Sequence, residues 1–259
     1  MNMHKKMVFL DIDGTILTKK NEIPYSTKQA IKQLQDNDIY VAIATGRAPF
    51  MFKSIREELN IHSFVSFNGQ YVVFEGKEVY RNPIKKDDLL RLNHEIMKNN
   101  YPIVFSSSEQ MKASEPNHLF IEESLSSMDF GYPEVDPNFY QSTSIYQALL
   151  FCKQEEEKQL AKQLPTLDFI RWHEFSCDVI PLGGSKAIGV EKLIEASGLA
   201  FEDTFAFGDG LNDMQMLQEI GTGVAMGNAV SDLKAVADYI TEDVDKDGLA
   251  NGLKHLGLI

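Results

Sequence analysis

Short runs of mostly hydrophobic residues alternate with amphipathic segments along much of the chain. Met7–Leu10, Tyr40–Ala44 and Phe64–Phe67 are runs of this kind, and segments with helical spacing of apolar residues lie between them. Strands that are apolar throughout and alternate with helices are typical of a parallel sheet with both faces covered. The pattern therefore predicts an α/β core.

Helix signals accompany this alternation. Ser26, followed three residues later by Gln29, has the spacing of a capping box and predicts the start of the first helix. A proline near its start supports a second helix over Arg47–Leu59. Ser185–Ser197 predicts a third helix, closed by Gly198. Further strands are expected at Thr204–Phe207, Gly223–Met226 and Tyr239–Thr241, and further helices at Asp213–Glu219 and Ala229–Ala237.

The middle of the chain follows a different order of elements. A helix predicted over Lys85–Lys98 precedes two strands, and a helix over Glu155–Gln163 precedes strands over Leu167–Trp172 and Cys177–Ile180. Consecutive strands with short links indicate antiparallel pairing. The middle is therefore predicted to be an α+β unit.

Turn-forming residues stand at both ends of this middle region. Asn82-Pro83 precedes it and Pro181–Gly184 follows it, as expected of linkers. We therefore predict a core of residues 1–83 and 184–259, interrupted by an inserted unit of residues 84–183. A chain of 259 residues is long enough for two modest domains.

Composition narrows the class of protein. The chain has 25 Lys and Arg against 38 Asp and Glu, a formal net charge of −13, which disfavours nucleic acid or an anionic membrane as a partner. Its apolar runs are too short for a membrane span, and the run after Lys5 and Lys6 is too short for a secretory signal. Cys152 and Cys177 lack metal-binding spacing, so we expect two buried, reduced thiols. We expect a cytoplasmic protein.

Four polar clusters stand at or beside the carboxyl ends of predicted core strands. Ligands of an open α/β sheet bind at this edge, near the point at which the strand order reverses. Because three clusters directly follow core strands and Lys186 opens a helix, we expect their side chains to converge on one site. The clusters are Asp11-Ile12-Asp13-Gly14-Thr15, Thr45-Gly46-Arg47, Gly184-Ser185-Lys186 and Gly208–Asp213.

Each cluster also has an ordinary structural interpretation. Asp-Gly pairs are common in turns, Thr45 could cap a helix, and the glycines around Asp209 could form a simple turn. Lys186 could be a solvated side chain, although a helix start is a slightly unfavourable place for a cation. Four such coincidences at compatible positions are improbable, so we favour a shared site.

The predicted site is rich in carboxylates. Asp11, Asp13, Asp209 and Asp213 would repel one another in a single cleft, and each would raise the pKa of its neighbours. A hard divalent cation relieves that repulsion, and Mg²⁺ prefers oxygen ligands of this kind. The sequence therefore predicts a Mg²⁺ site.

The same region offers the groups needed for phosphoryl chemistry. Lys186 and the backbone N–H groups around Ile12 and Gly46 would supply positive potential for a phosphoryl group. A carboxylate can attack phosphorus to form an aspartyl-phosphate, and a second aspartate can protonate the leaving oxygen and later deprotonate water. This combination predicts transfer of a phosphoryl group to water or to another acceptor.

These motifs resemble those of the haloacid dehalogenase (HAD) superfamily of aspartate-nucleophile phosphatases. Asp-x-Asp-Gly-Thr, the strand-end Thr-Gly-Arg, the lysine and Gly-Asp-Gly-x-Asn-Asp all match, and Asn68-Gly69 and Gly223–Ala229 are also similar. The place of the inserted unit, between the second and third motifs, is similar to that of the Cof-type subfamily with its type IIB cap. The resemblance implies a Rossmann-like HAD core with residues 84–183 as an α+β cap that selects the substrate.

The resemblance also implies a role for each motif residue. Asp11 would be the nucleophile and Asp13 the general acid and base. Thr45 would hydrogen-bond the phosphoryl oxygens, and Lys186 would neutralise charge on the nucleophile and the phosphoryl group. The remaining implied roles are Mg²⁺ ligation by the Asp11 carboxylate, the Asp13 backbone carbonyl and Asp209, orientation of a metal-bound water or of Lys186 by Asp213, and contact of Asn212 with phosphate.

The expected function is Mg²⁺-dependent hydrolysis of a small phosphorylated metabolite, such as a sugar phosphate or a phosphorylated cofactor, through an aspartyl-phosphate. One alternative keeps this chemistry but passes the phosphoryl group to another acceptor, as a phosphotransferase or mutase does. A second alternative is a non-enzymatic sensor of a metal or phosphometabolite. The presence of Asp13 disfavours the sensor, which has no need of an acid/base group.

An acidic segment near the C-terminus imitates a calcium-binding loop. Asp243, Asp245 and Asp247 have the spacing of the first EF-hand ligands, but Lys254 stands where that loop requires a glutamate. We therefore predict a solvated acidic loop over this segment.

Overall fold

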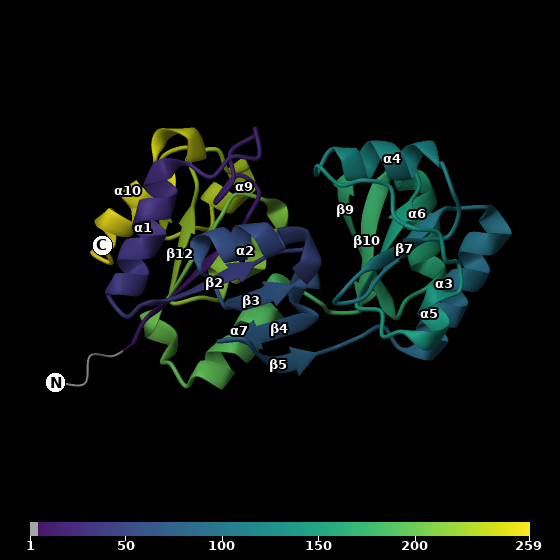
Figure 1. Ribbon diagram of the computed structural model, residues 1–259, viewed down its shortest axis with the longest axis horizontal. Coiled ribbons are helices and arrows are strands. Elements are labelled where there is room, and N and C mark those ends of the chain that lie inside the picture. Colours follow the sequence, from purple (N-terminus) through teal and green to yellow (C-terminus); the bar gives the residue numbers. More distant parts are fainter. Residues whose placement is uncertain (1–4) are drawn as a thin grey trace. The chain divides into compact units, whose positions relative to one another are not determined.

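A computed structural model describes residues 5–259, which form two compact units (Figure 1). The first comprises the residues through Gly46 together with Lys53–Tyr80 and Ser185–Ile259. The second comprises Arg47–Phe52 and Arg81–Gly184. The short segment Arg47–Phe52 thus groups with the second unit, although in the chain it lies between two stretches of the first.

The first unit is built on an eight-stranded sheet in the order β13-β12-β11-β1-β2-β3-β4-β5. Neighbouring strands are parallel from β13 to β3, whereas β4 runs antiparallel to β3. The strands are β1 (Met7–Leu10), β2 (Tyr40–Ala44), β3 (Ser63–Ser66), β4 (Tyr71–Phe74), β5 (Lys77–Arg81), β11 (Thr204–Gly208), β12 (Thr222–Ala225) and β13 (Tyr239–Ile240). The predicted parallel core is confirmed, and β4 and β5 add an edge that the hydrophobic pattern did not indicate.

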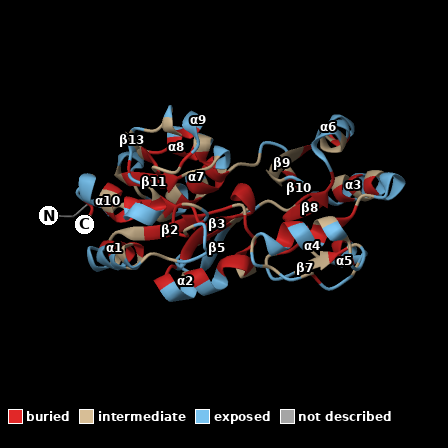
Figure 2. Cartoon of the chain, turned by 90° about the horizontal axis from the view of Figure 1, so that it is seen from above, coloured by how far each residue is buried: buried red, intermediate tan, exposed pale blue. Residues whose placement is uncertain are grey.

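Helices cover both faces of this sheet. Met7 and Phe9 of β1 share a hydrophobic cluster with residues of α7, α8 and α9. On the opposite face α1 packs against α2 and α10, and the Phe207 ring lies beside Gly252 of α10. Figure 2 shows β2 and β3 of this sheet largely buried and the outward faces of the helices exposed. The helices are α1 (Tyr25–Asp36), α2 (Lys53–Leu59), α7 (Lys186–Ser197), α8 (Met214–Gln218), α9 (Ser231–Lys234) and α10 (Gly248–His255).

The strand order reverses beside β1. The sheet grows through β2 and β3 on one side of β1 and through β11 and β12 on the other. Leu10, near the end of β1, is level with Ile43 of β2 and with Phe207 of β11. Because these three strands are parallel, the loops that follow them meet at one edge of the sheet, where α/β proteins bind ligands.

Of three predicted helix ends, one is wrong and two are confirmed. The capping box of Ser26 and Gln29 is wrong, because α1 begins at Tyr25 after Pro24, and Ser26 Oγ instead donates to Asp247 Oδ1 at 2.5 Å. Pro24 stands at the N-cap position, and no side chain caps this helix. The start of α7 is confirmed, because the Ser185 side chain accepts a hydrogen bond from the Ile188 N–H. Its end is also confirmed by Gly198, which adopts the left-handed conformation with φ of 69°.

The acidic segment near the C-terminus is only partly a loop. Val244–Lys246 forms a single 3₁₀ turn, and α10 begins at Gly248. The prediction of a solvated loop is therefore wrong from Gly248 onward. Leu249 and Leu253 are buried on one side of α10, which explains why this short sequence is helical.

The second unit contains a five-stranded antiparallel sheet in the order β7-β6-β8-β10-β9. The antiparallel pairing predicted for this region is confirmed. The strands are β6 (Ile103–Ser106), β7 (Met111–Ala113), β8 (Gln147–Phe151), β9 (Leu167–His173) and β10 (Ser176–Pro181), and the helices are α3 (Lys86–Asn99), α4 (Leu119–Ser126), α5 (Phe139–Ser142) and α6 (Gln154–Gln163). None of the helices between residues 5 and 259 combines the length and hydrophobicity of a membrane-spanning helix.

Separate hydrophobic clusters lie on the two faces of this second sheet. Leu150 and Cys177 pack with residues of α3, α5 and α6, whereas Leu149 and Phe151 pack with residues of α4. Successive residues of a strand point to opposite faces, so one strand serves both clusters. Cys152 and Cys177 are buried and free, as predicted from their surroundings in the sequence.

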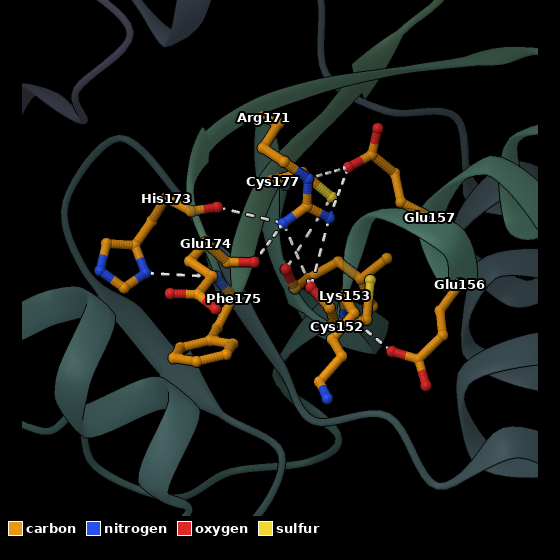
Figure 3. A network of polar contacts seen from close by, with 10 residues as sticks. Cys152, Lys153, Glu156, Glu157, Arg171, His173, Glu174, Phe175 and Cys177 are labelled. Carbon is orange, nitrogen blue, oxygen red and sulfur yellow. Dashed lines mark hydrogen bonds and ion pairs between the residues drawn. The ribbon is translucent and has the colours of Figure 1, made fainter.

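A single arginine joins three elements of the second unit (Figure 3). Arg171 of β9 donates to the Glu157 carboxylate of α6 at 2.6 Å and to the backbone carbonyl of Cys152 at 3.2 Å. Its guanidinium also donates to the carbonyl of His173, at the end of β9, and to that of Glu174, in the turn before β10. All three guanidinium nitrogens of Arg171 thus donate hydrogen bonds to groups of the same unit, so we interpret the network as structural.

Candidate active site

Three aspartates come together where the strand order of the first unit reverses. Asp11 directly follows β1, Asp209 directly follows β11, and Asp213 ends the 3₁₀ turn Leu211–Asp213. One carboxylate oxygen from each lies within 4.8 Å of the others. Asp11 and Asp213 are buried and Asp209 is half-buried. The structure therefore brings these three predicted site residues together.

Lys186 lies among these carboxylates. It is the first residue of α7, and only 1% of it is exposed. Its Nζ donates to Asp11 Oδ1 at 2.5 Å and to Asp213 Oδ1 at 2.7 Å. The alternative of a solvated lysine is wrong. A buried ammonium at a helix start is costly, and two carboxylates in contact with it offset that cost.

Both carboxylate oxygens of Asp213 accept hydrogen bonds from other parts of the site. One accepts the bond from Lys186, and the other accepts from the backbone N–H groups of Asp209 at 3.1 Å and Gly210 at 3.0 Å. Asp213 thus fixes the position of Lys186 and the shape of the loop that carries Asp209.

The Asp-x-Asp-Gly turn packs directly against Asp209. Gly14 has φ of +78°, and a Cβ there would overlap the Asp209 carboxylate and lie 3.0 Å from Asn228 Nδ2. Glycine is therefore needed both for its conformation and for its lack of a side chain. The carbonyl of Ile12, which is buried, accepts hydrogen bonds from the N–H groups of Ile16 and Leu17 and tightens this turn.

The predicted phosphate-binding turn after β2 is held from the neighbouring strand. Thr45 is buried, and its N–H donates to the carbonyl of Val65 in β3 at 2.9 Å. A Cβ at Gly46 would lie 3.0 Å from the side-chain amide of Asn68. Asn68 is buried in a left-handed conformation with φ of 50°, and its N–H donates to the Thr45 carbonyl.

Asp13 and Asn212 differ from the other predicted site residues because they are exposed. Asp13 lies two residues beyond Asp11, on the turn that follows β1, and Asn212 lies in the Leu211–Asp213 turn. An exposed carboxyl can exchange its proton with solvent, which suits an acid/base group.

Burial and crowding shift the ionisation of the site. Burial and the nearby Asp213 raise the pKa of Asp11 well above its usual range, although Lys186 acts in the opposite direction. Burial and Asp213 also raise the pKa of Asp209, to about 6. For Lys186, burial lowers the pKa, but Asp11 and Asp213 together outweigh it and raise the pKa overall. When all three carboxyl groups are ionised, they carry two negative charges more than the Lys186 ammonium balances, and an all-oxygen donor set with that charge fits Mg²⁺.

Sequence reasoning assigned no role to Asn228. Its Nδ2 donates to the Gly14 carbonyl at 2.9 Å and to Asp209 Oδ2 at 3.1 Å. The available signal was the segment Gly223–Ala229, which contains this residue and resembles the Cof-type subfamily. A hydrogen bond between positions 214 residues apart leaves no periodicity in the sequence.

Comparison with known proteins identifies the family. The haloacid dehalogenase-like hydrolases match residues 8–253 of the chain. The protein belongs to this family. It is 49% identical over 257 residues to "Putative phosphatase YkrA" of Bacillus subtilis (strain 168), an alignment that covers 99% of this chain and 100% of that protein.

Two solved structures have the same fold. A hypothetical protein from Geobacillus kaustophilus HTA426 has a TM-score of 0.94 and 51% identity, with 98% of this chain and 100% of that chain covered. The HAD subclass IIB sugar phosphatase BT4131 has a TM-score of 0.87 and 30% identity, with the same coverage. The protein is thus a Cof-type HAD phosphatase, a phosphoric monoester hydrolase that acts on small phosphorylated substrates.

Proposed function

We propose that this HAD phosphatase hydrolyses small phosphorylated metabolites with Mg²⁺, through an aspartyl-phosphate formed on Asp11. The observation that carries the proposal is the buried ion cluster of Asp11, Lys186 and Asp213 beside Asp209. Such a cluster provides a nucleophile, a fixed positive charge beside it, and an excess of negative charge that a divalent cation would balance.

The carboxylates of Asp11 and Asp209 and the backbone carbonyl of Asp13 are the proposed Mg²⁺ ligands. Asp213 is left out of this set because both of its oxygens already accept hydrogen bonds. Bound there, Mg²⁺ would keep Asp11 ionised and stabilise negative charge on the transferring phosphoryl group.

The proposed reaction has two steps. In the first, a carboxylate oxygen of Asp11 attacks phosphorus, the bond from phosphorus to the leaving oxygen breaks, and Asp13 gives its proton to that oxygen. In the second, the Asp13 carboxylate takes a proton from water while the water oxygen attacks phosphorus. The bond from phosphorus to Asp11 then breaks, which releases inorganic phosphate and restores both aspartates.

The remaining site residues would position and stabilise the phosphoryl group. Lys186 contacts the nucleophile directly and would offset charge that builds up during transfer. The proposed phosphate-binding groups are the backbone N–H groups of Ile12 and Gly46, the Thr45 hydroxyl, Lys186 and the Asn212 side chain.

Relatives support a polyhydroxylated leaving group. YcsE of Bacillus subtilis (strain 168), 28% identical to this chain, is a 5-amino-6-(5-phospho-D-ribitylamino)uracil phosphatase, and BT4131 is a sugar phosphatase. Both names describe a phosphate ester on a chain or ring that carries hydroxyl groups. We propose this substrate class for the present protein, with residues 84–183 as the part that selects among its members.

Hydrolysis of a generic aryl phosphate, with Mg²⁺ and with a chelator, tests the proposal. We expect activity with Mg²⁺ and a loss of at least about 1000-fold in kcat for Asp11→Asn, because an amide is a poor nucleophile. Asp36→Asn is the matched control, since Asp36 is an exposed residue paired with Lys32 on α1. Unchanged activity in the chelator, or an active Asp11→Asn variant, would contradict the proposal. Excess sugar in the same assay would reveal transfer to a hydroxyl instead of water.

A further inference from the structure

Asn228 lies between three separate parts of the first unit. It follows β12, and its side chain reaches the carbonyl of Gly14 after β1, the carboxylate of Asp209 after β11, and the backbone of Val244 after β13. The three bonds measure 2.9, 3.1 and 2.8 Å. Every hydrogen-bonding atom of the side-chain amide is therefore used within the fold.

The partners determine which way the amide points. The Gly14 carbonyl and Asp209 Oδ2 can only accept from it, so both bonds need the Nδ2 donor. The Val244 N–H can only donate, so it needs the Oδ1 acceptor. Aspartate at position 228 could not donate to the first two groups, and leucine could serve none of the three. The site thus requires a carboxamide of asparagine length.

The Asp209 carboxylate is held on two sides, by the hydrogen bond from Asn228 and by packing against Gly14. A Cβ at Gly14 would lie only 2.1 Å from Asp209 Oδ2, so this oxygen packs directly against the Gly14 backbone. One oxygen of Asp209 is therefore enclosed between the Gly14 backbone and the Asn228 amide.

We propose that Asn228 is a positioning residue of the divalent-cation site, which holds the Asp209 carboxylate in the orientation that binds the metal. This inference rests on the Mg²⁺ site of the proposed function. Asn228 acts through Asp209 and touches neither substrate nor reacting atoms. Groups that orient a metal ligand in this way typically contribute about 10- to 100-fold in metal affinity.

Titration calorimetry with Mg²⁺ alone tests the proposal on the full chain. We expect Asn228→Ala to raise the Mg²⁺ dissociation constant by about 10- to 100-fold. In the aryl phosphate assay, the Mg²⁺ concentration for half-maximal activity should rise by a similar factor. Once Mg²⁺ is saturating, kcat and KM should return to within about threefold of wild type. A merely structural role would lower activity at every Mg²⁺ concentration.

Asn251→Ala is the matched control, because Asn251 also donates its amide to a carboxylate, that of Glu242, and is similarly half-buried but lies outside the cluster. Asn228→Gln, which keeps the amide on a longer side chain, should weaken Mg²⁺ binding in the same direction and serves if the alanine variant does not fold. Wild-type Mg²⁺ affinity in a folded variant would overturn the inference. Failure of the wild-type protein itself to bind Mg²⁺ would instead refute the proposed function.

Discussion

At the scale of single residues, the site depends on charges that are buried together. Lys186 is in contact with Asp11 and Asp213, and none of the three is more than 6% exposed. Removal of one partner from such a cluster leaves charge without compensation, which usually costs more than the cluster contributes when intact.

Lys186→Met is therefore expected to reduce stability as well as activity. Loss of the ammonium leaves Asp11 and Asp213 facing each other, and we expect the free energy of unfolding at pH 7 to fall by about 3–5 kcal/mol. The loss should shrink toward pH 5, because protonation of the remaining aspartates relieves their repulsion. Urea unfolding at both pH values measures this. Lys192→Met on the same helix, whose partner Glu195 is exposed, should change stability by less than about 1 kcal/mol.

The raised pKa of Asp209 predicts that the metal-free protein loses stability as the pH rises toward neutrality. Its pKa is raised from 3.8 to about 6, first by burial and then by Asp213. Between these values the folded state binds more protons than the unfolded state, so the free energy of unfolding falls as pH rises from about 4 to about 6. Asp209→Asn lacks this titration and should be more stable than wild type at pH 7 by about 1–2 kcal/mol.

Thermal unfolding with a chelator present, across pH 4–7, checks this expectation. Wild type and Asp209→Asn should have similar stability near pH 4 and diverge above it. Mg²⁺ should stabilise wild type at pH 7 and have little effect on the variant, since only wild type retains the carboxylate ligand. Equal stability of the two proteins at pH 7 without metal would contradict the raised pKa of Asp209.

At the scale of elements, α7 carries Lys186 into the site by packing very closely on the sheet. Gly189 lies one turn after Lys186, and a Cβ there would overlap Val65 of β3 and come within 2.7 Å of Gly69. Close approach of helix and sheet therefore depends on two glycines in contact.

Gly189→Ala tests which of two effects decides the stability of α7. Alanine is favoured over glycine inside a helix by about 1 kcal/mol, so propensity alone predicts stabilisation. Because the added methyl group collides with backbone and a buried valine, we expect a net loss of about 1–3 kcal/mol and reduced kcat through displacement of Lys186. Gly198→Ala is a useful comparison, since nothing lies within 4 Å of a Cβ there. That change should cost about 1 kcal/mol through its left-handed backbone alone and leave kcat unchanged.

Elements could be predicted from the sequence where periodicity is strong. The first two core strands and α7 follow their predicted ranges within one residue, as do α6, β9 and β10 of the insert. Predictions were poor where tertiary contacts decide. The predicted helix Ala229–Ala237 is reduced to Ser231–Lys234, and Arg47–Leu59 begins as the 3₁₀ turn Pro49–Phe52 before α2. The hairpin of β4 and β5 was missed because β5 is largely exposed and lacks an apolar run.

At the scale of the whole molecule, the net charge of −13 contrasts with an active site built for anions. The long-range field disfavours large anionic partners, while a phosphate ester responds mainly to the groups that contact it. We expect no binding of duplex DNA at 150 mM salt, that is, a dissociation constant weaker than about 100 μM. Fluorescence anisotropy with a labelled duplex checks this, and micromolar affinity would contradict it.

The sequence by itself determined the order of the core elements and the residue types of the active site. Hydrophobic periodicity indicated the alternating elements, because that signal is local. Four motifs, which are local signals too, indicated as site residues Asp11, Asp13, Thr45, Lys186 and Asp209. The tertiary structure alone decided how the residues contact one another. It buried Lys186 between two aspartates and enclosed Asp209 between Gly14 and Asn228. Those contacts join positions up to 214 residues apart, and only the order of strands in the sheet brings them together.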